Sequence, residues 1–520
     1  MYTGLAAAGI ALLFAAPLVV SVAQAERQAA WRCADLAALT IPDATITAVQ
    51  EIAAGPFTPS GTTRALTVPE FCRVMAVATP SPDSRIAIEV WIPAGARWNG
   101  KLLGTGNGGF AGSIGYPAMA AGLAKGYATA GTDTGHTGDN LDFAIGHPEK
   151  LIDWSYRAIH VMTDLAKQVT KASRGRLPDR AYFEGCSTGG QQALSEAQRY
   201  PADYDGIVAG DPGHNRVRLI LGFLWSWTAM HEADGRAILP ASKLPLLTTA
   251  AVSACDAGDG LQDGLIADPL ACRFDPAALA CSGADREACL TAPQVEAVRK
   301  VYQGARHPRT AEQIFAGWAP GSESGWGSYL VNPKEPVRVA FLRTLVFNRP
   351  GWTPRDFDWE TDVAVADHAV PTVAATSRDY HAFNARGGKL IMYTGLADPV
   401  VPPGDTIRYY EEVVKATGGV AETQSFFRFF PVPGMGHCSG GPGPSSFDAL
   451  AALEQWHEQG IAPAQLLGRH LTDGVVDRTR PLCAFPSVAR LDRPGSPDVA
   501  ESFSCVVPSP VGLPPARDRR

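Results

Sequence analysis

The stretch AYFEGCSTGGQQALSEAQRY, residues 181–200, contains an apolar run, a glycine-flanked turn and a segment with helical periodicity. Within it, Gly185, Ser187 and Gly189 have the spacing Gly-x-Ser-x-Gly. A sharp turn between a strand and a helix exposes its serine as a nucleophile, and it needs glycines where side chains would clash. The same spacing is typical of a helix N-cap serine after a glycine turn, so this stretch alone leaves both interpretations open.

Other short apolar runs around this stretch favour a mostly parallel sheet covered by helices. The patterns predict strands over 85–93, 101–106, 127–133, 181–185, 205–211, 387–398 and 426–437, and helices over 115–125, 151–172 and 189–199. The pattern breaks at Pro212, after which the chain has cysteine-bounded loops and an aromatic-rich segment, FNRPGWTPRDFDWE, residues 347–360. Residues 212–386 are therefore predicted to be an insertion that closes over a site on an α/β core. The tail after about residue 480 is proline-rich.

The composition and the N-terminus limit the possible partners and compartment. The chain has 520 residues and a formal net charge of -7, and it contains no basic run that would favour nucleic acid as a partner. Residues 5–23 are uncharged and mostly apolar, and Ala23-Gln24-Ala25 forms an A-x-A cleavage site. This predicts a signal peptide over 1–25, although Met1 to Gly4 lack a basic residue, and an uncleaved anchor is the alternative. No later stretch is apolar and long enough to span a bilayer.

The ten cysteines predict disulfides in an oxidising compartment, because an even number follows a predicted signal peptide. No Cys-x-x-Cys occurs, so neither a zinc site nor a thioredoxin-type pair is indicated. Local spacing favours the pairs Cys255–Cys272, Cys281–Cys289, Cys483–Cys505 and Cys33–Cys72. Cys186 and Cys438 remain, far apart in the sequence.

A catalytic serine needs a base and an orienting carboxylate, which α/β-type hydrolases supply in the order Ser, Asp or Glu, then His. Asp398 follows a predicted buried strand, and His437 lies in a glycine-flanked loop after another. Both positions fall at the carboxyl ends of strands, where sites form in open α/β sheets. Asp405, in the turn PPGD, is the competing acid and is more typical of a helix cap.

Cysteines lie next to both the candidate nucleophile and the candidate base. Cys186 precedes Ser187, and Cys438 follows His437. If Ser187 and His437 approach each other, the two cysteines are close enough to bond, and the disulfide joins the two loops. Cys186 as the nucleophile is the alternative, but it requires a free thiol in an oxidising compartment.

A glycine-rich loop after an early strand normally supplies part of the oxyanion hole. Backbone N–H groups of Thr188, Gly108 and Gly109 are the candidates. The same loop has the spacing G-x-G-x-x-G at 104–109, with Asp133 about 24 residues further on, which resembles a dinucleotide-binding fingerprint. A secreted oxidoreductase is therefore an alternative, although nicotinamide cofactors do not fit the predicted compartment.

The segment CDAGDGLQDGLIADPLAC, residues 255–272, carries four aspartates and no Lys or Arg. Carboxylates forced together in a stapled loop repel one another unless a cation lies among them, and calcium accepts such oxygen ligands. The spacing differs from that of an EF-hand, and charge pattern alone favours a solvated acidic turn.

Together these motifs resemble the tannase and feruloyl esterase family, which includes mono(2-hydroxyethyl) terephthalate hydrolase. The resemblance rests on GNGGF, GCSTGG, CDAGDGLQDG, GLADPVVPP and GMGHC, in family order over nearly the whole mature chain. All ten cysteines fit the family's pairings, including Cys186–Cys438.

The resemblance implies an α/β-hydrolase catalytic domain, residues 26–211 and 387–520, with a lid domain at 212–386. It implies a catalytic Ser187, Asp398 and His437, and a structural Ca²⁺ in the lid held by Asp256, Asp259 and Asp263 with the carbonyls of Leu261 and Leu265.

The resemblance further implies a secreted or periplasmic enzyme that hydrolyses small esters of aromatic acids such as hydroxycinnamic or gallic acid. Mono(2-hydroxyethyl) terephthalate hydrolase-like activity is the nearest alternative, and an inactive binding module on the same scaffold is a further one. Substrate contacts are predicted within 341–360, where the alternative is that the aromatic residues form lid core. The sequence does not indicate an oligomeric state.

Overall fold

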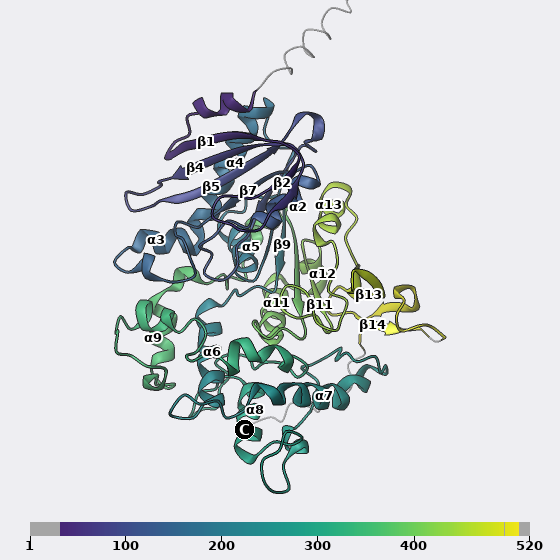
Figure 1. Cartoon of the computed structure of the whole chain (residues 1–520). Coiled ribbons are helices and arrows are strands. Elements are labelled where there is room, and N and C mark those ends of the chain that lie inside the picture. The colour runs from purple at the N-terminus through teal and green to yellow at the C-terminus, as the bar shows by residue number, and fades with distance from the viewer. Residues whose placement is uncertain (1–31, 493, 509–520) are drawn as a thin grey trace, which may run out of the picture.

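The computed structural model describes residues 32–492 and 494–508 (Figure 1). The predicted signal peptide, residues 1–25, lies outside the described residues, so its cleavage stays a prediction. Within the described ranges, no helix combines the length and the apolar character needed to cross a membrane.

A nine-stranded sheet forms the centre of the molecule, in the order β1-β4-β5-β7-β6-β8-β9-β10-β11. Its strands are β1 (Ala44–Ile52), β4 (Phe71–Ala78), β5 (Ile86–Pro93), β6 (Lys101–Thr105), β7 (Ala128–Thr132), β8 (Arg180–Cys186), β9 (Gly206–Gly210), β10 (Lys389–Gly395) and β11 (Phe427–Val432). All pairs from β7 to β11 are parallel, so the carboxyl ends of β6, β8, β9, β10 and β11 meet at one edge. This confirms the predicted mostly parallel sheet and places every candidate catalytic residue at that edge.

Apolar residues alternate between the two faces of the buried strands, which explains why both faces carry helices. In β8, Phe183 packs in the core on one face with α4 and α5, whereas Tyr182 packs on the other face with α13. β10 repeats the pattern, with Met392 in the first core and Ile391 in the second. The α-helices are α2 (Tyr116–Ala124), α3 (Pro148–Ile152), α4 (Ala158–Arg174), α5 (Thr188–Arg199), α6 (Arg216–Met230), α7 (Leu244–Cys255), α8 (Ala292–Gln303), α9 (Asp362–Ala369), α10 (His381–Ala385), α11 (Pro403–Thr417), α12 (Val420–Gln424) and α13 (Ala449–Gln459).

The segment between β9 and β10 adds no strand to the main sheet in the described chain. It has its own apolar core, to which α6, α7, α8 and α9 contribute, and Figure 1 shows these helices together below the sheet. Phe110 and Trp154 of the sheet-bearing part join this core, so the insertion packs on the α/β unit. The predicted boundaries at residues 212 and 386 stay a prediction.

Two parts of the fold were not predicted from the sequence. Strands β1 and β4 were missed. Together with β5, which is the strand expected over 85–93, they pair antiparallel and extend the parallel sheet on one side. The C-terminal part of the chain, from residue 465 on, forms two antiparallel pairs, β12 (Gln465–Thr472) with β13 (Val475–Cys483) and β14 (Val488–Leu491) with β15 (Phe503–Val506). A third small pair joins β2 (Gly55–Phe57) to β3 (Leu66–Val68).

Close packing at the strand ends generates a testable prediction. A Cβ atom on Gly190 would lie 2.2 Å from the carbonyl oxygen of Gly210 and 2.9 Å from Cα of Pro212, and both are backbone atoms that cannot rotate away. We expect Gly190→Ala to lower the free energy of unfolding by about 1–3 kcal/mol, measured by chemical denaturation.

Gly283→Ala is the matched control, because a Cβ there has no neighbour within 4 Å. Its effect is expected within about 0.5 kcal/mol of zero. Equal stability of the Gly190→Ala protein and the control would contradict this account of the packing.

Candidate active site

Ser187 lies on the turn between β8 and α5 with φ 64° and ψ −116°, a backbone conformation that is strained for a non-glycine residue. The turn requires neighbouring glycines, because the backbone segments that meet there lie too close together for a Cβ atom. A Cβ on Gly185 would lie 2.7 Å from Cα of Gly189, and one on Gly106 would lie 2.6 Å from the same atom. Ser187 therefore occupies the strained strand-to-helix turn that a nucleophile requires, and its side chain makes no capping hydrogen bond to α5.

His437 and Asp398 form a hydrogen-bonded pair at the ends of β11 and β10. The ring Nδ1 of His437 is 2.7 Å from Oδ2 of Asp398. Asp398 is fully buried, and its Oδ1 accepts hydrogen bonds from the backbone N–H groups of Val400 and Val401. Because a carboxylate only accepts, the proton of a neutral His437 lies on Nδ1, which leaves Nε2 free to act as a base.

Asp398 also governs the basicity of His437. Burial acts against the imidazolium, but the charge of Asp398 and its hydrogen bond outweigh burial and raise the pKa of His437 above its ordinary value. Asp405, the competing acid in the sequence, lies elsewhere. It is within the first turn of α11, whose N-cap is Pro402, so its predicted role as the helix cap is wrong. It pairs with Arg408.

The Cys186–Cys438 disulfide joins the turn of Ser187 to the loop of His437 across 252 residues of sequence. Ser187, Cys186, His437 and Cys438 line a common cavity. The four other predicted pairs are present as well: Cys33–Cys72, Cys255–Cys272, Cys281–Cys289 and Cys483–Cys505. Because Cys186 is bonded, it has no free thiol to act as the nucleophile.

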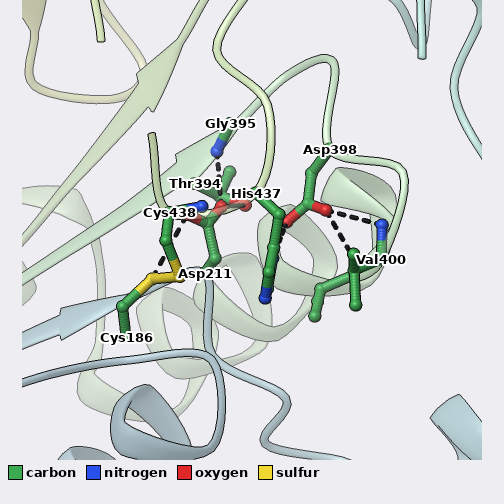
Figure 2. Close-up of a disulfide and its surroundings, with 9 residues drawn as sticks. Cys186, Asp211, Thr394, Gly395, Asp398, Val400, His437 and Cys438 are labelled. Carbon is green, nitrogen blue, oxygen red and sulfur yellow. Dashed lines mark hydrogen bonds and ion pairs between the residues drawn. A yellow bond between two sulfur atoms is a disulfide. The ribbon is translucent and has the colours of Figure 1, made fainter. Parts of the chain in front are cut away.

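Asp211, directly after β9, is a buried carboxyl at this site that the sequence interpretation missed. Its Oδ1 accepts hydrogen bonds from the N–H of Gly395 at 2.6 Å and the hydroxyl of Thr394 at 3.2 Å, and its Oδ2 accepts one from the N–H of Cys438 at 2.9 Å. Figure 2 shows Asp211 between the disulfide and the His437–Asp398 pair. It therefore ties the ends of β9, β10 and β11 together.

The ionisation of Asp211 is strongly disfavoured in this position. Burial, and after it the charge of Asp398, raise the pKa of Asp211 to about 8. Asp211 and Cys438 also have positive φ angles, of 35° and 62°. Such conformations persist only where surrounding contacts hold them, and they concentrate at functional sites. The only feature of the sequence that could have pointed to Asp211 is its place directly after a buried strand, in GIVAGDP.

The predicted oxyanion donors lie beside Ser187. Thr188 is the first residue of α5, so its N–H has no acceptor one helical turn earlier. Its hydroxyl donates to the carbonyl of Gly109 at 2.6 Å, and the N–H of Gly189 donates to the carbonyl of Asn107 at 2.8 Å. The glycine loop is thus fixed against the serine turn, and Gly108 and Gly109 line the cavity with Thr188.

The resemblance of this loop to a dinucleotide fingerprint has a structural explanation. Gly106 is required by the approach of Gly185 and Gly189, and a Cβ on Gly104 would lie 2.3 Å from the hydroxyl of Tyr204. Asp133 accepts hydrogen bonds from the N–H groups of Ala87 and Gly135. The glycine spacing follows from packing within the protein.

A cavity of about 530 Å³ extends from Ser187 toward the insertion. Its walls combine the serine and histidine loops with residues of α6, of the insertion after it and of the turn after β10: Leu219, Ile220, Phe223, Tyr329, Val337, Arg338, Val400 and Val401. Residues 341–360 do not contribute to this lining, so the prediction of substrate contacts there is wrong. Phe341, Leu342, Trp352 and Phe357 are instead buried in the core of the insertion, as the alternative interpretation expected.

The aspartate-rich turn folds back on itself. Asp256 accepts hydrogen bonds from the N–H groups of Asp263 and Gly264, and Asp259 accepts one from Leu261. Burial, and the charge of Asp263 in addition, raise the pKa of Asp259. One oxygen of Asp263 also contacts the guanidinium of Arg480 at 2.7 Å. Within the turn, the charge of Asp263 therefore acts against ionisation of Asp259, whereas the charge of Arg480 acts in its favour.

Comparison with known proteins identifies the family. A family model described as tannase and feruloyl esterase matches residues 72–506. The chain belongs to the tannase and feruloyl esterase family. It is 40% identical over 526 residues to an uncharacterized esterase of Xanthomonas campestris pv. campestris, with 91% of each chain covered. It is 32% identical to the mono(2-hydroxyethyl) terephthalate hydrolase of Piscinibacter sakaiensis, over 88% of this chain and 89% of that one.

A solved structure supports the same assignment. The crystal structure of feruloyl esterase B from Aspergillus oryzae has a TM-score of 0.86 at 29% identity, covering 91% of this chain and 99% of that chain. The predicted α/β-hydrolase fold is confirmed, and the protein is a carboxylic ester hydrolase.

The position of Asp211 generates a prediction about stability and pH. An unfolded Asp loses its proton near pH 3.9, whereas folded Asp211 does so near pH 8, so its ionisation destabilises the native state progressively as pH rises between these values. Asp211→Asn removes this titration but also removes an acceptor for the N–H of Cys438 or Gly395. We expect the variant to be less stable, and the difference in free energy of unfolding to shrink as pH rises from about 4 to about 8.

Urea denaturation at several pH values measures this difference. Asp205→Asn is the control. It also removes a carboxylate that accepts a backbone hydrogen bond, from the N–H of Ala181, but it lies at the other end of β9, away from the site. A difference for Asp211→Asn that stays constant with pH would refute the assigned burial of its charge.

Proposed function

We propose that this protein is a secreted serine esterase that hydrolyses esters of aromatic acids through an acyl-enzyme. The main support is the hydrogen bond of 2.7 Å between His437 and a buried Asp398, on the cavity that also contains Ser187 on its strained turn. A nucleophile, a base and an orienting carboxylate are the minimum machinery for acyl transfer.

In the proposed reaction, the Ser187 oxygen attacks the ester carbonyl while Nε2 of His437 takes its proton. N–H groups of Thr188 and of the Gly108–Gly109 loop stabilise the resulting oxyanion. His437 then returns the proton to the departing alcohol, which leaves Ser187 acylated. Water, deprotonated by His437, releases the acid, and Asp398 stabilises the imidazolium in both halves.

The shape of the cavity favours an aromatic acyl or alcohol group. Leu219, Ile220, Phe223 and Tyr329 provide apolar and aromatic surface along one side, and about 530 Å³ accommodates a substituted ring. The names of the relatives point the same way, since they include a feruloyl esterase and a hydrolase of a terephthalate ester.

An oxidising compartment belongs to the same proposal. All ten cysteines are paired in five disulfides, and such proteins are typically secreted or periplasmic. The predicted signal peptide over residues 1–25 fits this location.

A small panel of esters tests the function: methyl ferulate, methyl gallate, mono(2-hydroxyethyl) terephthalate and a short nitrophenyl ester. We expect turnover of at least one aromatic ester by the mature protein, and a loss of about 10⁴–10⁶-fold in kcat for Ser187→Ala. Ser195→Ala, a buried serine further along α5, is the control and should retain activity.

Full activity of Ser187→Ala would exclude the proposed nucleophile. Failure of the wild-type protein on every ester would favour the inactive binding module, and binding of nicotinamide cofactor would favour the oxidoreductase.

We also propose that Asp256, Asp259 and Asp263, with the carbonyls of Leu261 and Leu265, hold a structural calcium ion. The donor set consists of hard oxygen ligands in one turn closed by Cys255–Cys272, as calcium prefers. The charge of Asp263 acts on Asp259 within this turn, and a bound cation would relieve that repulsion. The ion would supply positive charge that fixes the turn.

Calcium removal should therefore destabilise the insertion. Chelation with EDTA is expected to lower the Tm of the wild-type protein, and added Ca²⁺ to restore it, because ligand binding to the native state alone stabilises it. In Asp259→Asn, whose Tm should already be lower, EDTA should have little further effect. A wild-type Tm indifferent to EDTA and to Ca²⁺ would rule out the site.

A further inference from the structure

A second cavity, of about 520 Å³, lies near the glycine loop and shares no lining residue with the catalytic cavity. Residues 112–114 and the start of α2 form one wall, and the segment between β2 and β3 forms the other. Residues 112–114 follow closely after Gly108 and Gly109 of the proposed oxyanion hole. The two cavities are therefore neighbours along one loop but have separate walls.

Apolar packing fixes the hairpin that forms the outer wall. Phe57 of β2 and Leu66 of β3 pack against a buried cluster that includes Trp91 and Met119. The rings of Phe57 and Trp91 meet edge to face, with their centroids 5.6 Å apart. The hairpin is thus attached to the sheet and to α2, so packed elements bound the cavity on both sides.

Asp133, directly after β7, brings a carboxylate to this cavity. Its Oδ1 accepts hydrogen bonds from the N–H groups of Ala87 at 2.9 Å and Gly135 at 2.8 Å, whereas its Oδ2 has no hydrogen-bond donor in the described part of the chain. Burial raises the pKa of Asp133 to about 6, so the carboxylate is mainly ionised at neutral pH. A partly buried carboxylate with one unpaired oxygen favours a ligand that donates a hydrogen bond.

Other polar groups of the wall are unpaired as well. Ser60, Ser113 and Thr137 line the cavity, and their hydroxyls make no hydrogen bond within residues 32–492 and 494–508. Arg64, on the hairpin loop, makes neither a hydrogen bond nor an ion pair in the same ranges. Hydroxyls both donate and accept and a guanidinium donates, so the wall offers partners to several polar groups of one ligand.

The charges around the cavity act against a charged ligand. Asp133 opposes an anion. Arg64 opposes a cation, and so does Arg85, whose charge acts on Asp133. Because the carboxylate and the guanidinium that line the cavity balance each other, the site suits a neutral ligand.

The remaining wall is apolar and rigid. Tyr116 stacks on Trp91 with ring centroids 5.9 Å apart, and its hydroxyl donates to Glu89 at 2.9 Å. Leu66 and Ile114 add apolar surface beside it. The cavity thus combines an apolar surface with a few polar groups, which is typical of small-molecule sites, and its volume is within their usual range.

We propose that the second cavity binds a neutral sugar unit whose hydroxyl groups donate to Asp133 and bond to the hydroxyls and the guanidinium of the wall. A sugar ring carries several hydroxyls that both donate and accept, and its C–H groups pack on apolar surface. The inference adds a binding site to the protein and does not depend on the proposed catalytic chemistry.

Calorimetry on the mature protein, with no ester present, tests the site. The probes are the methyl glycosides of glucose, galactose and mannose, and for each of them the uronic acid and the 2-amino sugar of the same configuration. At least one neutral glycoside is expected to bind, and its anionic and cationic counterparts to bind about 10-fold less tightly, because each meets a like charge.

Asp133→Asn examines the central contact. The amide oxygen still accepts from Ala87 and Gly135, but the amide nitrogen replaces the acceptor that faces the ligand. We expect the affinity for the neutral glycoside to fall about 10–100-fold, as for loss of a hydrogen bond to a charged group. If this variant fails to fold, Arg64→Ala on the exposed hairpin loop decides, with an expected loss of about 3–10-fold.

Asp142→Asn is the matched control, since Asp142 is an exposed acid of the following loop and does not line the cavity. Its affinity should equal that of the wild-type protein, and so should that of Ser187→Ala. Failure of all three neutral glycosides to bind would overturn the inference, whether or not the protein hydrolyses esters. Tighter binding of a charged counterpart would refute the neutral class, and unchanged affinity in Asp133→Asn would locate the sugar elsewhere.

Discussion

The site depends on holding together strand ends that come from distant parts of the chain. A parallel sheet brings the carboxyl ends of β8, β9, β10 and β11 to one edge, but the loops beyond them are free to diverge. Two connections prevent this: the Cys186–Cys438 disulfide, and the carboxyl group of Asp211, which binds the N–H groups of Gly395 and Cys438. The first is covalent and joins the serine turn to the histidine loop. The second is buried and polar, and adds the end of β10, from which Asp398 follows.

Close backbone contact explains the glycines better than any ligand does. Gly106, Gly185 and Gly189 come within van der Waals distance of one another because the glycine loop, the end of β8 and the start of α5 meet there. That contact sets the distance between the two halves of the proposed oxyanion hole. The hydroxyl of Thr188 contributes as well, by bonding the carbonyl of Gly109 and accepting from Arg216.

Much of the fold and the triad could be predicted from sequence, because the strands show in short stretches of the chain and the serine and histidine each have a neighbouring cysteine. Short apolar runs located the parallel strands, and cysteines beside both Ser187 and His437 indicated that two remote loops meet. Asp211 could not be recognised, since an Asp after a buried strand is common and its function depends on partners 183 to 227 residues away.

The cavity wall was misplaced for a related reason. The aromatic residues of 341–360 signal burial, which the core of the insertion satisfies, whereas the substrate wall comes from α6. Nothing in the sequence of α6 indicated that Arg216 faces a cavity. Of the two missed antiparallel strands, β1 lies at the edge of the sheet, where partial exposure weakens its apolar pattern.

The long span of the Cys186–Cys438 disulfide has a consequence for how the molecule is built. The insertion connects β9 to β10 through the backbone, yet the residues on either side of it are also joined through sulfur. The two halves of the catalytic unit therefore have two covalent paths between them, and only one passes through the insertion. A cut in the insertion would leave the serine and histidine loops attached to each other. The insertion, which forms part of the cavity wall, is therefore not needed to keep the serine and histidine loops together. Changes in its length or sequence can alter the cavity without separating the two loops.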